Sequence, residues 1–313
     1  MPRPHLYLLA GLLIACGVSY FSDHIDPYHL DVLTGIGINV ILAVSLNLVN
    51  GYTGQFSLGH AGFMSVGAYL AAAVSIFLGP KLLGEGGGTA WQQGLLFFGA
   101  LLAGGLSAAV AGLIVGVPSL RLKGDYLALV TLGFGEIIRV IFQNVEVLGG
   151  ALGLNGIPAY TTIFWVLAFV ALTVFTVICL VNSTYGRGFL ATHDDEIASE
   201  AIGLNTTRYK IVAFVIGAFF AGIAGGLYGH FKMTITPTGF DFTKSIEIVV
   251  MVILGGMGNT VGVILAAILL TLLPELLRPI AEYRMVIYSA LLIALMLVRP
   301  QGLFNFKFGK VKL

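Results

Sequence analysis

Long apolar runs alternate with short polar stretches along the 313-residue chain. Most runs reach about 17 to 25 residues, the length that an α-helix needs to cross a bilayer. They lie near residues 6–22, 32–50, 56–78, 94–117, 125–147, 161–182, 209–231, 245–257, 260–277 and 285–298. The runs are continuous, whereas the strands of a membrane barrel alternate polar and apolar residues. The pattern predicts an all-α, polytopic membrane protein with about ten transmembrane helices in one domain, 1–313.

Two places in this pattern indicate broken or re-entrant elements. The run 245–257 is short, and its end is rich in glycine, with Gly-Gly-Met-Gly at 255–258. The turn 51–55, Gly-Tyr-Thr-Gly-Gln, is tight. Irregular backbone at membrane depth is found where it is buried in protein or lines a cavity, so either segment would line a pathway. The first run resembles a signal peptide but lacks a small-x-small cleavage site, which predicts an uncleaved first helix.

Ten crossings would place both termini on one side of the membrane. The basic residues of the loops on that side are Arg3, Arg121, Lys123, Arg187, Arg208, Lys210, Arg299, Lys307, Lys310 and Lys312. Those of the other side are Lys81, Lys232, Lys244, Arg278 and Arg284. Since cytoplasmic loops carry the excess of Lys and Arg, the first side is predicted to be cytoplasmic.

Five helices precede residue 160 and five follow it. This division predicts two halves of inverted topology, 1–160 and 161–313, an arrangement typical of transporters. The halves show no convincing sequence match to each other, so the repeat is predicted from topology alone.

A charged loop, residues 186–208, interrupts the apolar pattern. Asp195 and Glu196 stand where a short helix would begin, at the positive end of its dipole. Gly203 stands where that helix would end, and Asn205 or Thr206 would cap the next helix. A short helix exposed on the cytoplasmic side of a membrane protein predicts a contact with another protein.

Composition excludes several classes of protein. Charged residues make up 10% of the chain and the net charge is +1, so no basic surface for nucleic acid is expected. The chain is 58% hydrophobic, which excludes disorder. It contains no nucleotide-binding, metalloprotease or serine-hydrolase motif, and no Cys/His cluster with metal-ligand spacing. We therefore expect neither catalysis nor a bound metal or cofactor in this chain.

Polar residues within the runs are candidates for a pathway. Glu136 and Arg139 lie three residues apart, on one face of a helix. They would form either a structural ion pair or a polar lining for a solute. Gln55, Ser57 and His60 stand at the entry of an apolar helix, where they would line an aqueous path or make hydrogen bonds between helices.

Small residues recur every four positions in two runs. One series is Ala100, Gly104, Ala108, Gly112 and Gly116, and the other is Gly217, Ala221, Gly225 and Gly229. Such faces let helices approach closely, so static packing is the favoured interpretation over gating.

Several collinear segments resemble the LivM-type permeases, the membrane subunits of bacterial branched-chain amino acid ABC importers. They are GQFSLGHAGFMSVGAYLAA (54–72), GDYLALVTLGFGEIIRVIFQN (124–144), DDEIASEAIGLNTTRYKIVAFVIGAFFAGIAGGLYGH (194–230), VILGGMGNTVGVILAAILL (252–270) and RPQGL (299–303). The resemblance implies a multi-pass protein of the bacterial inner membrane. It also implies a homologous LivH-type permease, two cytoplasmic ATP-binding subunits that use ATP, and an extracytoplasmic solute-binding protein as partners.

The same resemblance implies that residues 194–203 form the helix that couples the permease to its ATPase. Permeases of this class often carry Glu-Ala-Ala, three residues and Gly in this loop. Here Ile197, Ala198 and Ser199 occupy the Glu-Ala-Ala positions before Gly203. The acidic role would pass to Glu196 or Glu200, and the predicted coupling residues are Asp195, Glu196, Ala198, Glu200 and Gly203.

Two other functions fit the sequence. Importers of urea or short-chain amides have similar permeases, and the binding protein, a different chain, decides the solute. A stand-alone ion-coupled secondary transporter would need membrane carboxylates such as Glu136 or Glu247. Such a carrier has no use for a docking helix, which disfavours it.

Overall fold

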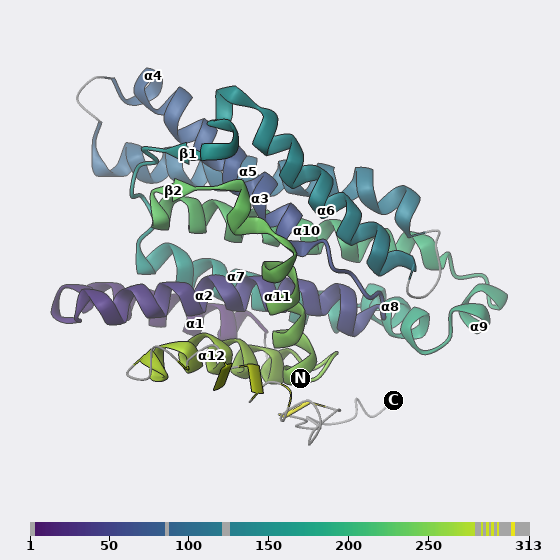
Figure 1. The fold of residues 1–313 in the computed structure, drawn as a ribbon. Helices are drawn as coiled ribbons and strands as arrows, with labels where there is room; N and C mark the ends of the chain where they lie inside the picture. The colour runs from purple at the N-terminus through teal and green to yellow at the C-terminus, as the bar shows by residue number, and fades with distance from the viewer. Residues whose placement is uncertain are drawn as a thin grey trace.

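The computed structural model describes residues 4–84, 88–120 and 126–278, and also residues 283, 286–287, 289–290, 293, 302 and 303. This part of the chain is a bundle of helices with one pair of two-residue strands (Figure 1). The α-helices are α1 (Pro4–Tyr20), α2 (Pro27–Asn47), α3 (His60–Ala73), α4 (Gly79–Leu83), α5 (Ala90–Ser119), α6 (Tyr126–Asn144), α7 (Ile163–Val181), α8 (Thr184–Asp194), α9 (Glu196–Ala201), α10 (Thr206–Lys232), α11 (Phe242–Gly255) and α12 (Thr260–Leu276).

The remaining elements are short. They are the 3-10 helices η1 (Ser22–His24), η4 (Glu146–Leu148), η5 (Gly150–Leu152) and η6 (Pro237–Phe240), the π-helical turns η2 (Leu48–Tyr52) and η3 (Val74–Leu78), and the strands β1 (Leu154–Asn155) and β2 (Thr234–Ile235). The strands pair antiparallel, with Leu154 opposite Ile235.

Six helical segments of the described chain are long and apolar enough to cross a membrane. They are Pro27–Tyr52, His60–Leu83, Ala90–Ser119, Tyr126–Asn144, Ile163–Val181 and Thr206–Lys232. Leu8–Tyr20 and Thr260–Leu276 are shorter apolar helices. Each predicted apolar run before residue 278 overlaps a described helix. The last one, 285–298, lies largely outside the described residues. The class predicted from the sequence, an all-α polytopic membrane protein, is confirmed.

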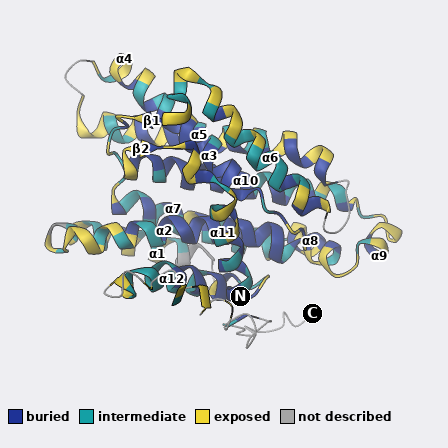
Figure 2. Cartoon of the chain, in the orientation of Figure 1, coloured by how far each residue is buried: buried dark blue, intermediate teal, exposed yellow. Residues whose placement is uncertain are grey.

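Small residues hold the centre of the bundle together. α10 packs against α3 and α5, and almost all its residues from 217 to 230 are buried (Figure 2). A Cβ added to Gly112 would lie 2.6 Å from the Cβ of Ala218, and one added to Gly104 would lie 2.7 Å from the carbonyl oxygen of Gly67. Because no side chain fits at these crossings, the two small-residue series serve close packing, as the sequence predicted.

The bundle has two distinct ends (Figure 1). α8 and α9 lie at one end, which we call the α9 end. α4, β1 and β2 lie at the other, which we call the strand end. α10 connects the two, since it begins just after α9 and is followed by β2.

Of the two predicted breaks, the first, between α2 and α3, is present, whereas the second segment forms a short, unbroken helix, α11. Beyond the π-helical turn Leu48–Tyr52, residues 53–59 have no helical structure before α3 begins at His60. After β2 the 3-10 helix η6 leads into α11, where the hydroxyl of Ser245 accepts a 3.2 Å hydrogen bond from the backbone N–H of Ala61. α11 has 14 residues. It is therefore about 21 Å long, shorter than the roughly 30 Å hydrocarbon core of a bilayer.

Candidate functional site

The charged loop contains one more helix than the sequence pattern predicted. α8 begins at a cap, where the backbone N–H of Gly186 donates a 3.3 Å hydrogen bond to the hydroxyl of Ser183. Phe189 anchors α8 because its side chain is fully buried with Leu48 and Ala213. Phe189 therefore holds α8, the helix that directly precedes α9, against α10.

α9 is a short helix with strong signals at both ends, as the sequence predicted. The carboxylate of Asp195 accepts a 3.0 Å hydrogen bond from the N–H of Ala198 and caps the first turn. After the last turn, the N–H of Gly203 donates to the carbonyl of Glu200, and the N–H of Leu204 donates to that of Ser199. This pair of bonds is a Schellman motif, which needs a left-handed residue. Gly203 supplies it, with φ of +88°.

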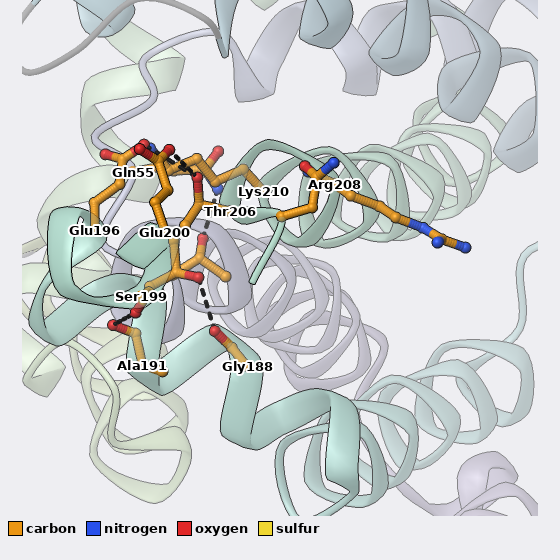
Figure 3. A network of polar contacts seen from close by, with 12 residues as sticks. Gln55, Gly188, Ala191, Glu196, Ser199, Glu200, Thr206, Arg208 and Lys210 are labelled. Atoms are coloured by element: carbon orange, nitrogen blue, oxygen red, sulfur yellow. Dashed lines mark hydrogen bonds and ion pairs between the residues drawn. The ribbon is translucent and has the colours of Figure 1, made fainter. Parts of the chain in front are cut away.

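Three polar contacts fix α9 to its neighbours (Figure 3). The ammonium group of Lys210 forms a 2.7 Å ion pair with Glu196. The hydroxyl of Thr206 donates a 2.8 Å hydrogen bond to Glu200. On the other side, the hydroxyl of Ser199 donates to the carbonyl oxygen of Ala191 at 2.8 Å. α9 is therefore joined both to α8 and to the first turns of α10.

These contacts change the role that the sequence suggested for the acids of α9. Both Glu196 and Glu200 have partners on α10, on the inner side of the loop. Glu200 is nevertheless exposed, and so is a group of apolar residues that we call the outward face: Ile197 is 74% exposed, Ile202 is 77% exposed, and Ala198 is exposed. Exposed apolar residues that lie together can mark a contact with another protein or with a membrane. Sequence reasoning considered only the charges of this loop and missed the outward face, although the sequence places Ile197 within the helix and Ile202 directly after it.

The non-helical segment 53–59 lies against the same loop. A Cβ on Gly54 would come within 2.8 Å of the ring of His193, at the end of α8. Gln55 is buried and is drawn with the α9 cluster in Figure 3. Its side-chain N–H donates a 2.9 Å hydrogen bond to Thr53, while its Oε1 has no partner among the described residues.

The other two candidates of this segment are buried with partners. The backbone N–H of Ser57 donates a 3.2 Å hydrogen bond to the side chain of Asn50. Nε2 of His60 lies 2.9 Å from the hydroxyl of Ser45, on α2. Ser57 thus joins the segment 53–59 to the turn that follows α2, and His60 joins α3 to α2.

Glu136 and Arg139 form an ion pair within α6. One guanidinium nitrogen of Arg139 lies 2.7 Å from a carboxylate oxygen of Glu136. The side chains are 35% and 25% exposed, respectively. The pair neutralises both charges on a single helix.

A polar cavity lies apart from all five of these pathway candidates. It has a volume of about 520 Å³ and is lined from α2, α3, the end of α10, α11 and α12. Sequence reasoning did not single it out, because its charged residues stand near the ends of different apolar runs. The sequence indicates only that acidic and basic residues both stand near the ends of these apolar runs.

Apolar helices of membrane-spanning length, joined by short polar loops, indicate a multi-pass membrane protein. The family model of the branched-chain amino acid transport system permease component matches residues 28–298. The chain belongs to this family.

Related proteins agree with the match. The chain is 35% identical to the high-affinity branched-chain amino acid transport system permease protein LivM of Salmonella typhimurium, over 99% of this chain and 77% of the relative. LivM of Escherichia coli gives the same identity and coverage. The permease protein LivH of Salmonella typhimurium is 24% identical over 84% of this chain and 90% of its own length. No solved structure matches the chain significantly.

Proposed function

We propose that this protein is a permease subunit of an ATP-driven importer of branched-chain or other apolar amino acids in a bacterial inner membrane. The observation that carries this proposal is the 35% identity to LivM over 99% of the chain. The more distant similarity to LivH identifies the kind of protein with which it would pair, a second permease of the same family. ATP hydrolysis belongs to two cytoplasmic subunits, and an extracytoplasmic binding protein delivers the solute.

The proposed importer places the α9 end in the cytoplasm. Loops assigned to that side carry the larger share of Lys and Arg, including Arg187 and Arg208. Residue Leu303 also supports a crossing back from the strand end after α12. Its N–H donates a 2.7 Å hydrogen bond to the carbonyl of Leu254, near the last turn of α11. Ten crossings, two inverted halves (1–160 and 161–313) and two cytoplasmic termini form the corresponding topology.

α9 is the proposed coupling helix. Ile197, Ala198 and Ile202 form its outward face and would contact an ATP-binding subunit. The ion pair between Glu196 and Lys210 then transmits a displacement of α9 to α10. Because α10 is packed through small residues against α3 and α5, it would move with them as a rigid unit.

Reconstitution tests this function. The chain is placed in proteoliposomes with the LivH-type permease, the two ATP-binding subunits and the solute-binding protein. Uptake of labelled leucine is then followed with ATP inside the vesicles. We expect uptake only with ATP and with every partner present, and none from this chain alone.

Three results would contradict this account in different ways. Uptake that persists with inactive ATP-binding subunits would refute the ATP-driven mechanism. Flux driven by a proton or sodium gradient through the chain alone would establish a secondary transporter. Saturable uptake of urea or short-chain amides in place of leucine would retain the mechanism and replace the solute.

A further inference from the structure

The polar cavity has its mouth at the strand end of the bundle. Asp31, in the first turns of α2, and Lys232, the last residue of α10, both line it. Arg278, just beyond α12, lines it as well. If the α9 end is cytoplasmic, this mouth faces the side from which a binding protein would deliver solute.

The mouth carries charges of both signs, and some of them already have partners. Lys244 forms a 2.8 Å ion pair with Glu247. The carboxylate of Glu275 accepts a 2.7 Å hydrogen bond from the hydroxyl of Tyr28. The guanidinium group of Arg278 lies over the ring of Tyr28, 5.2 Å from its centroid, and interacts electrostatically with Glu275. The charges of Lys244 and Arg278 are therefore balanced by those of Glu247, just outside the lining, and Glu275.

Within the described part of the chain, two opposite charges that line the cavity are left without an ionic partner. Among the described residues, the carboxylate of Asp31 has no ion pair or hydrogen bond. The ammonium group of Lys232 lies over the ring of Phe231, 4.8 Å from its centroid, and no described carboxylate lies within 4.0 Å of it. A free anion and a free cation on facing helices match the two ends of a zwitterion.

The inner wall of the cavity is neutral and largely apolar. Ile38 and Met64 are both at most 2% exposed and line the cavity. The side-chain amide of Asn39 donates a 3.0 Å hydrogen bond to the hydroxyl of Thr271, so this amide N–H already has a partner. A volume of about 520 Å³ lies within the usual range of small-molecule sites.

We propose that this cavity binds a zwitterionic amino acid with an apolar side chain, within this one permease subunit. The ammonium group of the solute meets Asp31, its carboxylate meets Lys232, and its side chain lies against Ile38 and Met64. This inference rests on the proposed function, because that function supplies both the solute class and the side of entry. It places a solute site inside the subunit, separate from the segment around Gln55 and His60.

Photo-labelling tests the site directly. The assembled importer, in nanodiscs of phosphatidylglycerol without ATP or binding protein, is irradiated with a diazirine analogue of leucine, and the adducts are mapped by mass spectrometry. We expect adducts on the peptides that contain Ile38 and Met64, suppressed by excess leucine. Asp31→Asn and Lys232→Gln should each lower labelling about fivefold or more, since each removes one charge-assisted contact.

Matched variants at the same end of the bundle serve as controls. Lys81→Gln and Glu146→Gln remove one positive and one negative charge from exposed positions outside the cavity, and both should leave labelling unchanged. Adducts elsewhere, or labelling unaffected by Asp31→Asn and Lys232→Gln, would overturn the inference. Labelling that falls when phosphatidylethanolamine is added, but not with excess leucine, would assign the cavity to a lipid headgroup and overturn it as well.

The uptake assay separates this inference from the proposed function. ATP-dependent leucine uptake without labelling of the cavity would refute the site and leave the importer intact. Labelling that leucine displaces, in an importer that shows no ATP-dependent uptake, would retain the site and refute the ATP-driven function.

Discussion

Two ion pairs of the same length, 2.7 Å, have different consequences in this molecule. The pair between Glu136 and Arg139 forms within α6 and joins it to no other described element. The pair between Glu196 and Lys210 joins two helices, and its side chains are less exposed, 25% and 10%. The local pair keeps two charges neutral on one helix. The second pair helps to hold α9 against α10, so in the proposed mechanism it is the one on which coupling depends.

Lys210→Met should have the largest effect. The substitution keeps a long side chain but leaves Glu196 without its cation, a loss of about 2 kcal/mol after discounting for the partial exposure of Glu196. We expect leucine uptake to fall at least tenfold while ATP hydrolysis by the complex continues. Both rates are measured on the same proteoliposomes.

The charge swap Glu196→Lys with Lys210→Glu is the control for that experiment. It restores an ion pair at the same place and should recover part of the uptake. If Lys210→Met transports normally, or if the swap is as inactive as the single variant, the pair does not link α9 to α10.

Gly203→Val should have the next largest effect. A β-branched residue at φ of +88° costs about 1 to 2 kcal/mol and would unwind the Schellman turn that ends α9. Nothing lies within 4 Å of the added Cβ, so the cost is one of backbone conformation and not of packing. Uptake should fall while the bundle keeps its thermal stability in detergent.

Gly203→Asn is the matched control, because Asn tolerates the left-handed region better than other residues. It should retain more uptake than Gly203→Val. Equal uptake by wild type and the Val variant would remove this turn from the mechanism.

Glu200→Gln should have a smaller effect. Glu200 is exposed, and its contact with Thr206 is one hydrogen bond of 2.8 Å, which an amide oxygen also accepts. The expected loss is about 0.5 kcal/mol, with uptake within about twofold of wild type. A tenfold loss, with the ATP-binding subunits dissociating at high salt, would instead indicate that the carboxylate contacts a partner.

Removing both charges of the local pair should have the smallest effect. In Glu136→Gln with Arg139→Gln no charge is left unpaired in the membrane, so uptake should stay within about twofold of wild type. Either single variant should show less uptake than the double variant, because it leaves one charge unpaired. If the double variant is inactive but correctly inserted, Glu136 and Arg139 line the solute pathway.

Local signals explain why the ends of α9 could be predicted from the sequence. The cap at Asp195, the stop at Gly203 and the next cap at Asn205 each act over three or four residues. The spacing of Glu136 and Arg139 likewise predicted their pair, since residues three apart share a helical face.

Contacts between segments that are distant in the sequence could not be predicted from it. Nothing local indicates that Glu196 turns toward Lys210, or that Asp31 and Lys232 share a cavity. α8 was also missed, because its eleven residues carry only a short apolar stripe, including Tyr185 and Phe189, among glycines and polar residues. The predicted docking residues and pathway residues remain predictions, and the experiments above are their tests.

The outward face of α9 gives the most direct test of the account. Ile197→Asp with Ile202→Asp is expressed with the LivH-type permease and the ATP-binding subunits, and the complex is purified through a tag on this chain. The account predicts that the ATP-binding subunits are lost, by about tenfold or more, because two exposed apolar anchors are replaced by charges, while the partner permease still co-purifies. Full recovery of the ATP-binding subunits with this double variant would contradict the claim that α9 is where they dock.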